Sequence, residues 1–415
     1  MPARNTVATR AGRRDDAPTW TVRVLSVTTL YPSAVAPRHG IFVETRLRQL
    51  LALGGIDVRV AAPVPWFPFA GKAFGRFGMY AATPAREERW GILVYHPRYL
   101  SLPHIADALR LRSLAAAYAR VAAELLEGGW DCDVVDAHYL YPDGVAAAHF
   151  AQRLGRPLVL TARGSDVNYF GWLPTPRRHI LAALVQARRV ITVSHALRDA
   201  LIAIGASPTG IEVLRNGVDV ALFRPGGGPE VRARLGLGSE PLVLSVGNLV
   251  PEKGHLLVLE AVARLAGVHL LVVGEGPLRR QLAARAERLG VAARVHLHPN
   301  VPQTELARIY SAADVLVLAS TREGCPNVLL EALACGTPVV TSDVGGAREI
   351  VTDGVVGHVV SERTAEAFAA AIDRTLTRDF DPAELRRYAE HFSWKPIVQR
   401  YRQILAEAAS DRQDG

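Results

Sequence analysis

The chain has 415 residues, is 49% hydrophobic and carries a formal net charge of +8, so it is long enough for two ordinary domains with separate cores. Three cysteines, Cys132, Cys325 and Cys335, are too few for a disulfide framework and fit no zinc-site spacing, which makes a reducing cytosol the expected compartment. No apolar run approaches the roughly 20 residues of a spanning helix, so we expect no helix that crosses a membrane.

Residues 1–18 are polar and basic without an apolar run. They are predicted to form a disordered tail and do not make a convincing signal peptide or transit helix. Beyond them, short β-branched runs alternate with amphipathic helical segments, which is the pattern of a parallel sheet covered by helices. In the first half, strands are expected over 23–30, 57–63, 92–96, 133–138, 158–161 and 190–193, and helices over 42–52, 105–126, 143–154 and 177–187.

The same alternation occurs again in the second half of the chain. Strands are expected there over 242–246, 269–273, 295–297, 315–318 and 339–341, with helices between them. The stretch RPGGGPE over 224–230 is the Gly/Pro cluster near mid-chain, so the linker is expected there or just before it. The pattern predicts two Rossmann-like domains with a ligand cleft between the carboxyl edges of their sheets. The expected division is 1–18 tail, 19–222 first domain, 223–380 second domain and 381–415 closing helices.

Two glutamates lie eight positions apart in TREGCPNVLLEALACGTPVV, residues 321–340. A helix is predicted to begin at Pro326 or Asn327 and to end at Gly336, which leaves Glu323 in the preceding loop and Glu331 just over one turn inside. The backbone N–H groups of residues 324–328 then lie at the positive end of the helix dipole, and this predicts an anion site. Spacing alone also allows both residues to be ordinary capping and surface glutamates.

This segment resembles the EX7E motif of the family 4 glycosyltransferases. Other stretches match the same family in the same order: GIFVE at 40–44, DAHYLYPDG at 136–144, TARGSD at 161–166, VGNLVPEKG at 246–254 and VGEGPL at 273–278. The matches cover nearly the whole chain after the tail. The resemblance implies a GT-B architecture, α/β with two Rossmann-like domains that face each other across a cleft and a C-terminal helix that crosses back to the first domain.

The resemblance also implies a reaction. A retaining glycosyltransferase moves a sugar from a nucleoside diphosphate donor to the hydroxyl of a glycan or lipid-linked acceptor. Lys253 and the N-terminus of the helix predicted to begin at Pro326 or Asn327 would stabilise the diphosphate. Glu323 and His138 would hold the sugar, and Glu331 would hold the ribose. The donor-binding set implied is Gly40, Asn248, Glu252, Gly276, Arg322, Gly324, Cys325, Pro326, Asn327, Val328 and Glu331, with Tyr139, Arg163 and Asp166 as acceptor or sugar contacts.

One position departs from the family pattern. Relatives grip the diphosphate with an arginine and a lysine; the lysine is present as Lys253, whereas Asn248 stands where the arginine is expected. Asparagine carries no charge and cannot make a bidentate contact with phosphate, which weakens the clamp by about 1–3 kcal/mol unless another cation replaces it. Arg322 and Arg163 are the candidate replacements.

Other chemistries fit the sequence less well. The triplet Asp131-Cys132-Asp133 matches a D-x-D metal motif but lies at the start of a strand, so no essential metal and no cofactor are expected. A dinucleotide fingerprint is absent after the first strand. A sugar-nucleotide-binding relative without activity, or an epimerase or hydrolase on the same architecture, stays open while Asn248 replaces the arginine.

The first half of the chain is the basic half. Residues 1–200 hold 25 Lys and Arg against 15 Asp and Glu, a net +10, which leaves −2 for the rest. Residues 64–80 interleave six aromatic residues with Lys72 and Arg76, a composition typical of a lipid interface and equally of a loop that packs its aromatics under itself. We expect a cytoplasmic protein attached to an anionic inner membrane face, with no nucleic-acid partner.

Overall fold

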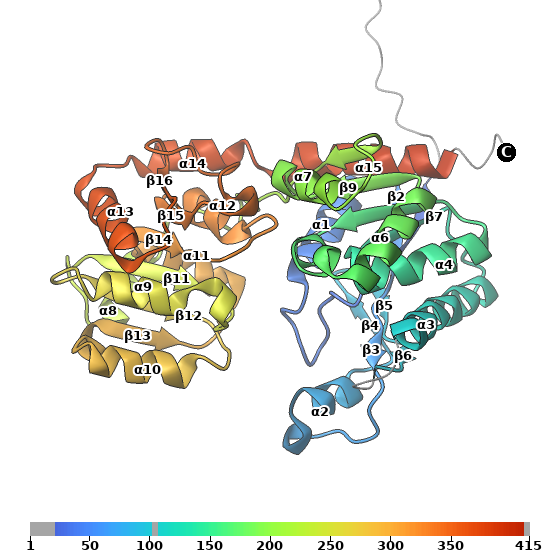
Figure 1. The fold of residues 1–415 in the computed structure, drawn as a ribbon, viewed down its shortest axis with the longest axis horizontal. Helices are drawn as coiled ribbons and strands as arrows, with labels where there is room; N and C mark the ends of the chain where they lie inside the picture. The colour runs from blue at the N-terminus through green and yellow to red at the C-terminus, as the bar shows by residue number, and fades with distance from the viewer. Residues whose placement is uncertain (1–20, 102–106, 411–415) are drawn as a thin grey trace, which may run out of the picture.

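The computed structural model describes residues 21–101 and 107–410, which form two α/β lobes beside each other (Figure 1). The predicted tail over 1–18 and the first residues of the helix expected over 105–126 lie outside the described residues, as do the side chains of Lys72 and Arg76. Within the described residues, no helix is both long enough and apolar enough to cross a bilayer.

The first lobe is built on an eight-stranded sheet with the order β10-β9-β8-β7-β1-β2-β5-β4. Neighbouring strands are parallel, except that β4 pairs with β5 antiparallel. The strands are β1 (Val22–Val27), β2 (Ile56–Ala61), β4 (Arg86–Arg89), β5 (Ile92–Tyr95), β7 (Val134–His138), β8 (Leu158–Ala162), β9 (Arg189–Thr192) and β10 (Ile211–Val213). A separate two-stranded pair joins β3 (Val64–Pro65) to β6 (Arg98–Tyr99).

Helices cover both faces of this sheet (Figure 1). Side chains of β1 show the division, because Leu25 and Val27 pack toward α3, α4 and α6, whereas Val22 and Val24 pack toward α1 and the C-terminal helix α15 (Trp394–Ser410). The helices of the lobe are α1 (Ile41–Ala52), α2 (Gly75–Ala82), α3 (Asp107–Glu127), α4 (Val145–Leu154), α5 (Ser165–Asn168), α6 (Pro174–Gln186) and α7 (His195–Ala203). The alternation of strand side chains between two cores is what a sheet covered on both faces requires.

The second lobe repeats this architecture with a six-stranded parallel sheet in the order β13-β12-β11-β14-β15-β16. Its strands are β11 (Leu242–Val246), β12 (His269–Val273), β13 (Val295–His298), β14 (Val315–Leu318), β15 (Val339–Ser342) and β16 (Gly357–Val360). Its helices are α8 (Gly228–Arg234), α9 (His255–Val262), α10 (Arg279–Arg288), α11 (Gln303–Ala312), α12 (Asn327–Ala334), α13 (Ala365–Thr377) and α14 (Pro382–Glu390). The predicted architecture of two facing parallel-sheet domains is confirmed.

The chain passes between the lobes twice. Leu214 packs in a first-lobe core and Val218 in a second-lobe core, so the first passage lies between them, a few residues before the Gly/Pro cluster. α14 packs on α12 within the second lobe, and α15 (Trp394–Ser410) then returns to lie against α1, β1 and β7. There the hydroxyl of Tyr401 donates a 2.5 Å hydrogen bond to Asp136 Oδ2, beneath the cleft.

Candidate functional site

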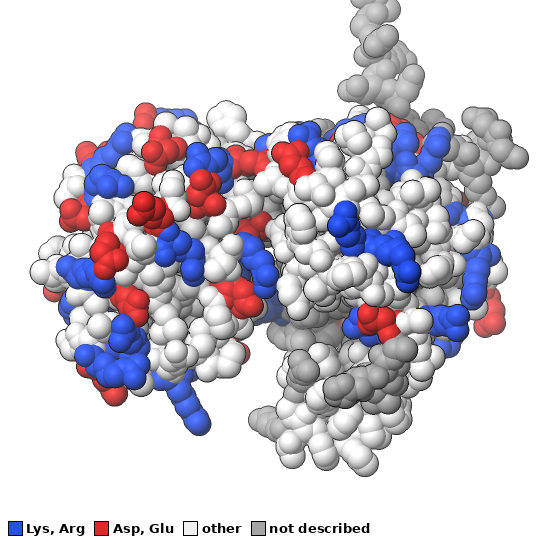
Figure 2. Space-filling model, viewed as in Figure 1, with Lys and Arg blue, Asp and Glu red and all other residues white. Residues whose placement is uncertain are grey.

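Loops at the carboxyl ends of both sheets meet across the space between the lobes, which Figure 2 shows as a hollow. This space holds two adjoining cavities of about 650 Å³ and 240 Å³. Both cavities are lined by Phe42, Arg163, Lys253, Glu323 and Gly324, so they form one cleft with walls from both lobes. The carboxyl edges of parallel sheets are where such folds bind ligands.

Lys253 and Glu323 form the charged pair of the second-lobe wall. Lys253 ends the short turn η4 (Pro251–Lys253) after β11, and its Nζ lies 2.6 Å from Glu323 Oε1. The hydroxyl of Ser320, just beyond β14, donates to the same oxygen at 2.7 Å. The Glu323 carboxylate is therefore held in a fixed orientation, with its other oxygen available to accept hydrogen bonds from a ligand.

The N-terminal end of α12, its mouth, lines the smaller cavity. Its lining includes Gly324, Cys325, Pro326, Asn327 and Val328, the stretch predicted to carry the anion site. Within the described residues, no group accepts a hydrogen bond from the backbone N–H of Gly324, Asn327 or Val328. Because α12 begins at Asn327, these N–H groups lie at the positive end of its dipole. The geometry suits a phosphate oxygen.

Glu331 lies one turn further into α12, on the wall of a third cavity of about 70 Å³ that also contacts Phe42 and Asn327. The hydroxyl of Tyr310 donates to Glu331 Oε2 at 2.8 Å. Burial nevertheless raises the pKa of Glu331 to about 7. The carboxyl group therefore keeps its proton to a higher pH than an exposed glutamate does, and a ligand hydroxyl that donates to it would favour the ionised form.

The rest of the second-lobe wall mixes uncharged, acidic and basic side chains. Asn248, Glu252 and Arg322 all line the larger cavity. Arg322 Nη2 lies 3.4 Å from Glu252 Oε1, and its guanidinium carbon lies 5.3 Å from the centre of the Tyr169 ring. The exposed Asn248 side chain faces solvent while its carbonyl lies 3.2 Å from His255 Nε2. No positive charge stands at position 248.

His138 is placed differently from the predicted cleft-facing position. Its side chain is 0% exposed and lines neither cleft cavity, because Arg163 lies over it. His138 Nδ1 accepts from Arg163 Nη2 at 2.8 Å, and Nε2 lies 3.0 Å from Asp136 Oδ2. Burial and the Arg163 charge lower the pKa of His138 to about 4, against the pull of Asp136. In this structure the neutral imidazole contacts Arg163 and lies outside both cleft cavities, and its predicted contact with the sugar stays a prediction.

The loop after β8 explains the buried position of Asp166. Its carboxylate accepts from the backbone N–H groups of Leu140, Arg163 and Gly164 at 2.6–3.1 Å, and the side chain is fully buried. Predicted as an acceptor or sugar contact, Asp166 instead holds this loop in shape. Tyr139 does line the larger cavity, and its hydroxyl bonds the Ser165 hydroxyl at 2.6 Å.

Of the two glycines predicted to bind the donor, only Gly40 lines a cleft cavity. Gly40 lines the larger cavity with φ 68°, and a Cβ there would lie 2.2 Å from the carbonyl of Leu30, so only glycine fits. Gly276 packs against the backbone of Leu249 and lines neither cleft cavity. Its role is to seat one loop on another.

Sequence reasoning missed Asn216, which lies in the passage between the lobes and lines the smaller cavity. Its Oδ1 accepts from Arg46 and Arg163, both at 3.2 Å, and its Nδ2 donates to Asn327 Oδ1 at 3.0 Å. The only local signal is an Asn-Gly pair, which is typical of a turn. The residues it joins are far apart in the sequence, so no spacing pattern reveals the contact.

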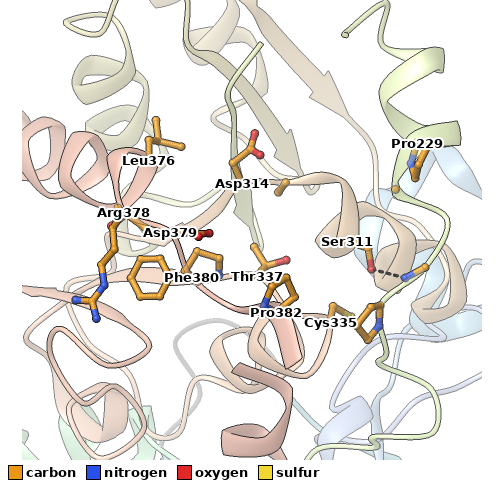
Figure 3. A pocket seen from close by; sticks show the side chains of 17 residues that line it. Pro229, Ser311, Asp314, Cys335, Thr337, Leu376, Arg378, Asp379, Phe380 and Pro382 are labelled. Carbon is orange, nitrogen blue, oxygen red and sulfur yellow. Dashed lines mark hydrogen bonds between the residues drawn. The ribbon is translucent and has the colours of Figure 1, made fainter. Parts of the chain in front are cut away.

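A further hollow of about 400 Å³ lies elsewhere on the second lobe (Figure 3). Ser311, Asp314, Thr337 and Arg378 contribute to its wall, and the Ser311 hydroxyl accepts from the Gly226 N–H at 3.2 Å. Asp314 and Pro338 directly precede β14 and β15, so this hollow is at the amino edge of the sheet. None of the predicted site residues lines this hollow, and parallel sheets bind ligands at the opposite edge.

The acidic D-x-D triplet lies away from the cleft. Asp131 forms an ion pair with Arg156, and Asp133 lies 2.8 Å from Arg23, at the amino end of β7. Within the described residues, no group of three or more His, Cys, Asp or Glu side chains is arranged to hold a metal ion. The absence of an essential metal stays a prediction.

Comparison with known proteins adds sequence and structural relatives. Residues 43–222 match the family described as Glycosyltransferase Family 4, and residues 229–392 match the family described as Glycosyl transferases group 1. A Bacillus subtilis (strain 168) protein named as the teichuronic acid biosynthesis glycosyltransferase TuaC is 31% identical over 385 residues, covering 91% of this chain and 92% of that protein. The D-inositol 3-phosphate glycosyltransferase of Mycobacterium tuberculosis (strain F11) is 36% identical over 243 residues, or 54% of this chain and half of that enzyme.

Two solved structures share the fold. The sucrose-phosphate synthase of Thermosynechococcus elongatus superposes with a TM-score of 0.76 at 24% identity, covering 93% of this chain and 100% of that one. The Anabaena protein HepE, solved in complex with UDP and glucose, gives a TM-score of 0.72 at 21% identity over 93% of this chain and 99% of that one. Both superpose over nearly the full length of the chain, so the likeness extends to both lobes.

Proposed function

The chain belongs to the family 4 glycosyltransferases with the GT-B architecture, and on that premise we propose that it transfers a sugar from a nucleoside diphosphate sugar to an acceptor hydroxyl with retention of anomeric configuration. The observation that carries the proposal is the cleft wall on which Lys253, Glu323 and the free N–H groups of α12 converge. Positive charge and aligned N–H groups suit a diphosphate, and an oriented carboxylate suits sugar hydroxyls. HepE, of the same fold, has been solved with UDP-glucose, which supports a donor of this class.

The proposed reaction forms one bond and breaks one bond at the anomeric carbon. The acceptor oxygen attacks on the face from which the diphosphate departs, and the leaving phosphate oxygen takes the acceptor proton. An oxocarbenium-like sugar and a departing diphosphate have to be stabilised, so fixed positive charge at the phosphates is the largest expected contribution. Lys253 and the α12 mouth provide that charge from this chain's own groups, and we propose a reaction that needs no metal or cofactor.

Glu323 and Glu331 have separate tasks in this scheme. The Glu323 carboxylate, oriented by Lys253 and Ser320, accepts hydrogen bonds from the transferred sugar. Glu331 accepts from the ribose, whose hydroxyls stabilise the ionised carboxylate against the burial that raises its pKa to about 7. His138 acts from behind Arg163, as the support for that side chain.

The test is a screen of nucleotide sugars by thermal shift on the full chain, followed by product analysis. One donor is expected to raise Tm by roughly 3–6 °C at about 100 times its Kd and to yield a product of retained configuration. Glu323→Ala is expected to abolish transfer, whereas Glu362→Ala, an exposed glutamate outside the cleft cavities, leaves it unchanged. Binding without transfer would indicate an inactive relative, an epimerised donor would indicate an epimerase, and a hydrolysed donor a hydrolase.

For the acceptor, we propose a lipid-linked glycan reached from the cytoplasmic face of a membrane. The segment around β3 and α2 leaves Trp66 48%, Phe69 57% and Phe74 43% exposed, although the rings of Phe67, Phe69 and Phe74 also pack on one another. Figure 1 shows α2 projecting from the first lobe away from its sheet. Aromatic residues at such a tip suit the interfacial region of a bilayer.

Flotation with anionic liposomes tests this attachment. The wild-type chain is expected to float with the vesicles at low salt, and the double variant Trp66→Ser, Phe69→Ser is expected to remain largely in the unbound fraction because it loses interfacial aromatic area. A matched variant, Trp172→Ser, removes an exposed tryptophan outside the segment and should float like the wild type. Failure of the wild-type chain to float at low salt would contradict membrane attachment.

A further inference from the structure

On the second-lobe wall of the cleft, Asn248 carries no charge, so a second cation for the diphosphate has to come from elsewhere if the proposed function holds. Two arginines that line the cleft are candidates from the sequence. Arg322 belongs to the second lobe and Arg163 to the first. Their surroundings differ enough to choose between them.

Arg322 is already engaged. Its guanidinium is paired with Glu252 at 3.4 Å and lies over the Tyr169 ring, and the side chain is 39% exposed. It lines the larger cavity only, away from the one into which the α12 N–H groups open. A charge that is shared with a carboxylate and screened by water contributes little to binding another anion.

Arg163 has the opposite character. It is 8% exposed, lines both cavities, and its backbone touches Gly324, where an added Cβ would lie 2.2 Å from the Arg163 carbonyl oxygen. Both acceptors of its guanidinium among the described residues are uncharged, namely Asn216 Oδ1 at 3.2 Å and His138 Nδ1 at 2.8 Å. Its Nε finds no acceptor in the described part of the chain. The buried charge is therefore oriented, uncompensated by a bonded carboxylate, and next to the α12 mouth.

We propose that Arg163 is the first-lobe cation of the diphosphate site and acts there together with Lys253 of the second lobe. The site is then completed only when both lobes are in contact, because Arg163 comes from the loop after β8 and the free N–H groups come from α12. Burial lowers the pKa of Arg163 to about 9, with the neighbouring Arg46 adding to the effect, so the side chain remains charged at neutral pH. A phosphate there would remove the cost of a buried, unpaired charge.

Asn216 is the positioning residue of this arrangement. Its amide oxygen holds Arg163 and its amide nitrogen holds Asn327, the first residue of α12. The two halves of the site, one from each lobe, are thus bonded to the oxygen and the nitrogen of one amide group in the passage between the lobes. An aspartate at position 216 would instead form an ion pair with Arg163 and neutralise it.

The test uses inorganic pyrophosphate as the probe, titrated into the full chain by calorimetry, because it carries no base or sugar. Arg163→Gln is expected to weaken pyrophosphate binding by roughly 10- to 100-fold, the usual effect of a lost charge-assisted contact. Arg163→Lys should bind with intermediate affinity, since it keeps the charge without the planar fork. Arg153→Gln is the matched control, with the same change of charge on the exposed face of α4, and should bind within twofold of the wild type.

Asn216→Asp separates positioning from mere structural support. It is expected to raise Tm, because it pairs with two buried arginines, while weakening pyrophosphate binding as much as Arg163→Gln does. This variant also decides the question if Arg163→Gln does not fold. Unchanged affinity in the Arg163 variants that fold and in Asn216→Asp, a loss that follows Arg322→Gln instead, or no binding by the wild type would each overturn the proposal.

The outcome is distinguishable from the fate of the proposed function. If the wild type transfers a sugar and the Arg163 variants bind pyrophosphate normally, this inference fails and the function stands. If pyrophosphate binds through Arg163 but no nucleotide sugar is bound or transferred, the cationic site is real and the glycosyltransferase proposal fails.

Discussion

Lys253→Ala is expected to lower kcat/KM for sugar transfer by about 10²–10³-fold, comparable to the loss of one preorganised charge-stabilising group in other active sites. Lys253 is the cation 2.6 Å from Glu323, on the cavity wall it shares with the α12 mouth. Its removal takes positive charge from the departing diphosphate and leaves Glu323 as a bare carboxylate beside it. Because this unpaired negative charge repels the diphosphate, kcat/KM should fall strongly while Tm changes little. Steady-state kinetics measure the first quantity and thermal unfolding the second.

A matched control for this experiment exists on α15. Lys395 is exposed and lies outside the cleft, so Lys395→Ala removes the same charge without touching the site. It should transfer sugar at the wild-type rate. Adding Glu323→Gln to Lys253→Ala removes the repelling carboxylate, and the double variant is expected to bind the donor more tightly than Lys253→Ala alone. A Lys253→Ala enzyme within fivefold of the wild type would contradict the assigned role.

Gly324→Ala is expected to lower kcat/KM by about 100-fold, because it acts on the contact between the lobes. A Cβ at this position would lie 2.2 Å from the Arg163 carbonyl oxygen and 3.1 Å from Gly164 Cα, both backbone atoms that cannot rotate away. The lobes therefore have to separate to admit one methyl group. Displacements of about 1 Å in an active site commonly cost this much activity.

Gly238→Ala controls for the general effect of replacing a second-lobe glycine. The closest atom to a Cβ there is Glu240 Oε2 at 3.4 Å, an ordinary contact with a flexible side chain. Kinetics should remain unchanged in this control, while small-angle scattering of Gly324→Ala should report a larger radius of gyration than the wild type. Wild-type activity in Gly324→Ala would mean that the lobes need not touch here during turnover.

The sequence predicted the large elements because their patterns are long enough to be unambiguous. β-branched runs such as 242–246 and amphipathic helices between them indicated parallel sheets, and both sheets are present. The short β3–β6 pair and the antiparallel pairing of β4 with β5 were not predicted. β3 and β6 have two residues each and β4 reads REER without an apolar residue, so none of them carries a period-two hydrophobic pattern, and their pairing depends on tertiary contacts.

The candidate site was likewise predictable only where its position follows from the order of strands in the sequence. Lys253, Glu323 and the start of α12 could be placed from the sequence because each belongs to the segment that follows a predicted strand, and strand ends of parallel sheets share one edge. The burial of His138 and Asp166 could not, because it depends on how Arg163 and the backbone of the neighbouring loop fold over them. Asn216 escaped notice because its partners, Arg46, Arg163 and Asn327, come together only in the folded chain.

The position of α15 also has a consequence for biosynthesis. Tyr401, Ile404 and Leu405 complete a core against β1 and α1. These two elements precede α15 by more than three hundred residues, so they leave the ribosome long before it does. Until α15 has been synthesised, it cannot cover its face of the first sheet. Asp136 also lacks the Tyr401 hydroxyl that donates a hydrogen bond to it. The half of the enzyme that is made first can therefore finish its fold only after the other half has been translated.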